Sequence, residues 1–122
     1  MPESFARVLE SLREPGTSRL SAARVAALMG LQVQELATFA GVHRNTMRLH
    51  PESASVQAAL RDLVRLLSAA SAIQPDLQRM VFFIKNEPIG SFGQTTLLDI
   101  ARIGRVDEAI AYLESVAFGF AG

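Results

Sequence analysis

The sequence predicts a small all-α protein, and three observations lead to that prediction. Apolar residues recur three and four positions apart through most of the chain, which is the spacing of one helix face. Glycine and proline separate these apolar segments. No segment sustains the apolar–polar alternation of a half-buried strand. With 122 residues, of which 49% are hydrophobic, the chain can form one packed domain or two very small ones.

The first half of the chain is expected to hold four helices, over residues 5–12, 21–29, 33–40 and 44–49. Ser21 is a favourable N-cap for the second helix because its hydroxyl can accept a backbone N–H. Gly30 and Gly41 stand where a left-handed residue would end the second and third helices. Pro51 closes the fourth.

The second half begins with a long amphipathic helix over residues 56–73. Pro75 suits the first turn of the helix that follows. The stretch KNEPIGSFGQTTLLDI then interrupts the helical pattern with Pro88, Gly90 and Gly93. We expect this elbow to turn the chain back within a second small unit.

Thr96 and Asp99 form a pair that resembles a capping box, and they restart a short helix whose apolar run extends to Ile103. A last helix is expected from about Val106 to Ala117. The chain therefore divides into an N-terminal region, residues 1–73, with a helix turn helix at about 33–50 and a connecting helix, and a C-terminal region, residues 74–122.

Composition limits the classes of function. The formal net charge is zero, which argues against non-specific coating of nucleic acid but permits a local basic surface. The absence of cysteine excludes a disulfide framework and a thiolate zinc site. The N-terminal residues lack the apolar core of a signal peptide, and no apolar run approaches the length of a membrane span. We expect a cytoplasmic protein without a membrane partner.

No arrangement of residues predicts catalysis, so we expect neither enzyme activity nor a cofactor. His43 and His50 lie seven positions apart without a carboxylate pair beside them, which makes a poor metal site. The GSFG segment is too short for a phosphate-binding loop and lacks the lysine that follows one.

The segment over 33–50 has the residue set of a helix turn helix. Ala37 is small enough to let two helices approach, and Gly41 can take the turn conformation that other residues resist. Val42 and Met47 would hold the second helix against the first. The polar positions of the second helix then point outward, and we expect a DNA-binding surface made of Gln34, His43, Arg44, Asn45, Thr46 and Arg48.

These side chains suit DNA because arginine can bond guanine bidentately, asparagine can do the same for adenine, and polar groups beside them can anchor phosphate. One alternative is an ordinary helical hairpin with a charged face. Another frame pairs residues 21–29 with 33–40, but its reading helix would carry no cation. Phosphate contacts supply much of the affinity for DNA, which disfavours that frame. Such modules usually bind as dimers, so a homodimer is expected.

Two segments together resemble a known family. ELATFAGVHRNTMRLHPES resembles the Xre-type helix turn helix of the Xre/MbcA/ParS antitoxins, and the chain from Phe82 to Gly122 resembles their C-terminal toxin-binding domain. The shared features of that domain are an aromatic residue, an Asn-x-Pro turn, a glycine loop, a threonine helix start, a Gly-Arg turn and a final helix. Leu97 replaces the usual proline, Met47 replaces the commoner leucine, and Gln94 stands in a loop that often has a second glycine.

The resemblance implies the antitoxin of a type II toxin–antitoxin system. Its partner would be a RES-domain toxin that consumes NAD or transfers ADP-ribose from it. The C-terminal region would cover the toxin's active site, and the N-terminal region would bind the promoter of its own operon. The alternative function is a stand-alone transcription regulator whose C-terminal helices dimerise or bind a ligand.

Toxin contact is expected at the end of the chain. Phe118 and Phe120 alternate with small residues, so the tail suits insertion into a cleft, although a frayed terminus or packing on its own domain would give the same pattern. Arg102 and Arg105 flank the same region, and their simpler interpretation is a solvated face. The expected toxin-binding residues are Arg102, Arg105, Phe118, Gly119, Phe120, Ala121 and Gly122.

Overall fold

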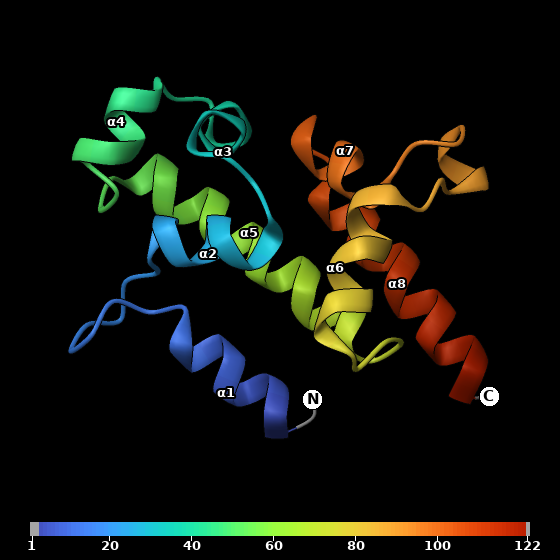
Figure 1. Ribbon diagram of the computed structural model, residues 1–122. Helices are drawn as coiled ribbons and strands as arrows, with labels where there is room; N and C mark the ends of the chain where they lie inside the picture. The colour runs from blue at the N-terminus through green and yellow to red at the C-terminus, as the bar shows by residue number, and fades with distance from the viewer. Residues whose placement is uncertain (1–2, 122) are drawn as a thin grey trace. The chain divides into compact units, whose positions relative to one another are not determined.

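The computed structural model describes residues 3–121, with the side chains of residues 5–119, and within that range it is all-α (Figure 1). Eight α-helices and one 3-10 turn make up its regular structure, and the two isolated bridges do not extend into strands. The described residues include no helix with the length and apolar content that crossing a membrane requires. The helices are α1 Glu3–Ser11, α2 Ala22–Met29, α3 Val33–Ala40, α4 Arg44–Leu49, α5 Ala54–Ser71, α6 Leu77–Asn86, α7 Leu97–Arg102 and α8 Val106–Ala121.

The chain folds as two compact units, and the boundary between them lies inside α5. One unit is Ala6–Val64, and the other is Arg65–Gly122 with Met1–Phe5. The sequence placed the boundary after residue 73 instead, at the end of a helix. The boundary falls inside this 18-residue helix because α5 supplies fully buried leucines to both units. Leu60 lies on one side of the boundary and Leu67 on the other.

Several helix ends have the caps that the sequence predicts. The Ser21 hydroxyl accepts the Arg24 N–H at 3.2 Å, and Gly30 ends α2 at a φ of 64°. The Thr96 hydroxyl accepts the Asp99 N–H at 3.2 Å. The Asp99 carboxylate, expected to complete a capping box, accepts a hydrogen bond from Arg102 at 2.7 Å.

Other ends differ from the prediction. Pro75 lies outside α6 because Asp76 is the N-cap, with its carboxylate accepting the Arg79 N–H at 3.0 Å. Ile103, expected on the apolar face of the short helix, is 65% exposed and follows the last residue of α7. α8 continues to Ala121, so the segment expected to be a loose tail is helical. A lone glycine at 119 weakens a helix without having to end it.

The elbow between α6 and α7 is a short, hydrogen-bonded turn. The Ile89 N–H donates to the Thr95 carbonyl at 3.0 Å, and the Gln94 N–H donates to the Ile89 carbonyl at 2.9 Å. Between them Gly90–Phe92 form a 3-10 turn. The Phe92 ring lies 5.7 Å from the Tyr112 ring of α8, centroid to centroid. The elbow therefore folds onto its own unit, as expected.

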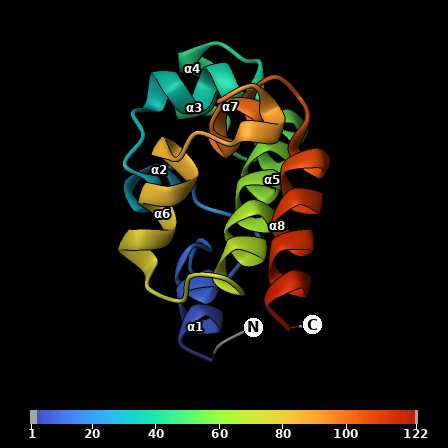
Figure 2. The same ribbon diagram turned by 90° about the vertical axis from the view of Figure 1, so that its right-hand side faces the viewer.

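The helices of the second unit pack around a common core. α7 packs against both α6 and α8, and α8 runs beside the end of α5, where Arg65 pairs with Asp107 at 2.7 Å (Figure 2). The fully buried side chains of this core come from every helix of the unit, among them Leu67, Met80, Ile84, Leu97 and Leu113.

Candidate nucleic-acid interface

A tight turn joins α3 to α4 in the first unit (Figure 1). Gly41 ends α3 at a φ of 70°, a left-handed conformation that favours glycine. The N–H of Val42 then donates to the Ala37 carbonyl at 3.0 Å. Ala37 and Met47 are each 2% exposed. These are the positions that the sequence predicted would hold a helix-turn-helix pair together.

A buried glutamine fixes the segments around this hairpin. Gln57 of α5 is 9% exposed, and its amide accepts the Leu20 N–H at 3.1 Å. The same amide donates to the Leu20 carbonyl at 3.0 Å and to the Pro51 carbonyl at 2.8 Å. It therefore ties Leu20, two residues before α2, and Pro51, two residues after α4, to one point on α5. Gln57 was not predicted from the sequence to have a role, although its position three before Leu60 places it on the apolar face of α5.

The exposed face of α4 carries cations that are free to bind a partner. Arg44, Asn45 and Arg48 are exposed. The guanidinium groups of Arg44 and Arg48 form no ion pair within the described part of the chain. Thr46 is half-buried, so it contributes less to this face than expected. An unpaired arginine on a short helix can bond phosphate or a base edge without first breaking an internal contact.

Gln34 lies beside this face. It lines a shallow hollow of about 360 Å³ together with Thr38, His43 and Arg44. The Thr38 hydroxyl is occupied because it donates to the Gln34 carbonyl at 3.0 Å. Of the six predicted DNA-binding residues, the structure thus brings Gln34, His43 and Arg44 around one hollow, with Asn45 and Arg48 further along the same helix.

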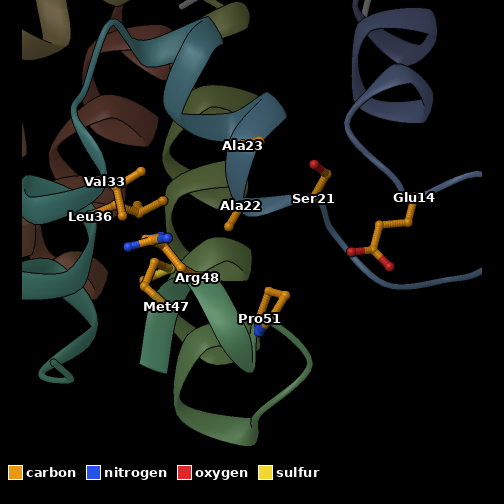
Figure 3. A pocket seen from close by; sticks show the side chains of 9 residues that line it. All are labelled: Glu14, Ser21, Ala22, Ala23, Val33, Leu36, Met47, Arg48 and Pro51. Atoms are coloured by element: carbon orange, nitrogen blue, oxygen red, sulfur yellow. The ribbon is translucent and has the colours of Figure 1, made fainter. Parts of the chain in front are cut away.

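Arg48 also lines a second hollow, of about 340 Å³, on the side of α4 nearer α2 (Figure 3). Its side chain lies near Leu36 and Met47, while Ser21 and Glu14 stand on the opposite side (Figure 3). An arginine stem can lie along apolar surface while its charged head stays in water.

The acidic groups near the hairpin are engaged. The Glu35 carboxylate accepts the Gln32 N–H at 3.0 Å, and Glu52 lies 3.3 Å from His50 Nδ1. The pKa of Glu52 is lowered, first by a hydrogen bond to its own backbone N–H and then by the hydrogen bond from His50.

The residues expected to contact a toxin have mixed positions. Arg102 pairs with Asp99 at 2.7 Å, and Arg105 pairs with Glu108, so both guanidinium groups already have anionic partners. Phe118 is 77% exposed on α8, and Gly119 lies in the same helix. The Phe120 and Ala121 side chains and the whole of Gly122 lie outside the described residues.

The described residues contain no group of three or more histidine, cysteine, aspartate or glutamate side chains placed to hold a metal ion. Comparison with protein-family models, with curated proteins and with solved structures finds no match for this chain.

Proposed function

We propose that the protein binds DNA in a sequence-specific manner through the α3–α4 hairpin. The observation that carries this proposal is the unpaired, exposed set of Arg44, Asn45 and Arg48 on a helix that packs on α3, with Ala37 and Met47 both buried. Arginine can read guanine and asparagine can read adenine in the major groove. A rigid hairpin holds these groups in one register, which base readout needs.

Selection from a random DNA pool with the full chain tests this proposal. The wild type is expected to enrich a short motif, with two half-sites if the protein binds as a dimer. Arg44→Ala and Arg48→Ala should each weaken binding to the selected site. Recovery of unenriched sequences by the wild type would contradict the proposal.

Within this function, we propose an antitoxin that represses its own promoter and neutralises a RES-domain toxin. The support is the resemblance of both segments, together with the apolar side chains exposed on the second unit. Phe82 and Ile103 are each 65% exposed and Phe118 is 77% exposed. Contact through the end of α8 replaces the extended tail that the sequence suggested, because the backbone is helical to Ala121.

Co-expression with the product of the adjacent gene tests the antitoxin proposal. The wild type should rescue growth, and a chain ending at Ala117 should rescue it less well. Full rescue by the truncated chain would contradict a role for Phe118 and the residues after it. If the product of the neighbouring gene is not toxic, the stand-alone transcription regulator is favoured. That function also uses the DNA-binding hairpin.

A further inference from the structure

His43 stands at the start of α4 with its two ring nitrogens in different situations. It is the N-cap residue, and its Nδ1 accepts the backbone N–H of Asn45 at 3.0 Å. A nitrogen that accepts a hydrogen bond from an N–H must carry a lone pair instead of a proton. In the neutral ring the proton must therefore be on Nε2.

The Nε2–H is available to a partner. His43 is exposed, and no other hydrogen bond of its ring exists within the described residues. The ring borders the hollow of about 360 Å³ that Gln34, Thr38 and Arg44 also line. It is thus a donor of fixed tautomer, placed beside the cations of the proposed DNA-binding surface.

We propose that His43 reads a base edge in the major groove by donating its Nε2–H, while Nδ1 caps α4 and holds the ring in place. This inference rests on the proposed DNA binding and adds a specificity residue to it. The residues at the start of a recognition helix lie closest to the base edges. A single N–H donor selects a base that presents an acceptor, such as N7 or O6 of guanine, N7 of adenine or O4 of thymine. Cytosine offers a donor there and would be rejected.

The two histidines provide an internal comparison for the tautomer. The Nδ1 of His50 lies 3.3 Å from a carboxylate oxygen of Glu52, so this nitrogen is the donor in its ring. Long-range proton–nitrogen NMR of the two rings in their neutral form should show the proton on Nε2 of His43 and on Nδ1 of His50. A proton on Nδ1 of His43 would overturn the assignment.

Two variants separate the cap from the donor. His43→Ser keeps a side-chain oxygen that can cap α4 but removes the ring. His43→Ala removes both. We expect the serine variant to melt close to the wild-type temperature and the alanine variant to melt lower. Both should bind the selected site about threefold to tenfold more weakly, the range for one hydrogen bond.

Base readout predicts a specific pattern of loss in binding to a panel of single base-pair variants of the selected site. His43→Ser should lose discrimination at one position and keep it at the others. Equal weakening on every sequence would indicate a phosphate contact and would overturn the inference, as would unchanged affinity. If the wild type selects no DNA, the proposed function fails, and this inference fails with it. If the wild type selects a site and the His43 variants bind it with unchanged affinity, only the inference about His43 fails and the proposed DNA binding stands.

Discussion

Backbone conformation at single residues explains where the turns of this protein form. Gly41 and Gly93 have positive φ, and both end a helical segment. Gln94 also has a φ of 67°, and it is the one residue other than glycine with positive φ among residues 3–121. The sequence singled out Gln94 because the family that the chain resembles often has glycine in this loop. A side chain there adds local strain, because the left-handed region disfavours residues with a Cβ.

Replacing Gln94 with glycine should therefore stabilise the protein. We expect Gln94→Gly to raise the free energy of unfolding by about 0.5 kcal/mol, the relief of strain being partly offset by the greater freedom of glycine in the unfolded chain. Urea denaturation measures the change. Ser91→Gly, in the adjacent 3-10 turn, is the matched control and should lower stability by a similar amount. Equal losses in both variants would contradict strain at Gln94.

The Glu52 carboxyl should titrate below its usual range in the folded protein. Its own backbone N–H is the first cause and His50 the second, so His50→Ala should raise the pKa of Glu52 only partly. A lowered folded-state pKa means that the stabilising effect is present above the unfolded-state pKa and is lost as pH falls through the folded-state value. Carbon-13 NMR of the carboxyl measures this. A pKa unaffected by His50→Ala would contradict the contact.

Helix boundaries show which parts of the fold a sequence can predict. The start of α2 and the ends of α2 and α3 were predicted because Ser21, Gly30 and Gly41 cap the backbone by local chemistry. The end of α8 was predicted wrongly because no residue after Ala117 compels a stop. Gln57 was missed because its partners, Leu20 and Pro51, are distant in sequence or carry no polar side chain. Its role depends on tertiary structure.

Removing the Gln57 amide should destabilise the first unit. Gln57→Ala leaves the Leu20 N–H and two carbonyl groups without their side-chain partner in a largely buried place. We expect a loss of about 2–4 kcal/mol in the free energy of unfolding, since one buried unsatisfied group costs about 1–3 kcal/mol. Ser55→Ala, at an exposed position of α5, should change it by less than about 0.5 kcal/mol. Similar free energies of unfolding for Gln57→Ala and Ser55→Ala would contradict a stabilising role for the Gln57 hydrogen bonds.

At the scale of the whole molecule, the chain separates two proposed tasks. The hairpin proposed to bind DNA belongs to the unit Ala6–Val64, and the exposed Phe82, Ile103 and Phe118 belong to the other. The exposure of Arg44, Asn45 and Arg48 on α4 was predictable from the sequence. The glycine turn and the apolar face together define which side of this short helix is exposed. The ring orientation of His43 was not predictable, because it depends on one backbone hydrogen bond.

The DNA complex should contain two copies of the chain. A single hairpin covers a short half-site, so modules of this kind usually bind as dimers to half-sites about one helical turn apart. Native mass spectrometry of the full chain with its selected duplex should show two chains for each duplex. A complex with one chain on a non-repeated motif would contradict the dimer.

The affinity of arginine variants for the selected site tests most directly whether α4 reads DNA. Arg44→Ala and Arg48→Ala should each cost about 1–3 kcal/mol in specific binding and relax base preference at one position. Arg79→Ala removes an exposed cation from the other unit and should leave binding unchanged. Fluorescence anisotropy at one fixed salt concentration gives the three affinities. Wild-type binding by both hairpin variants, or an equal loss in all three, would contradict the claim.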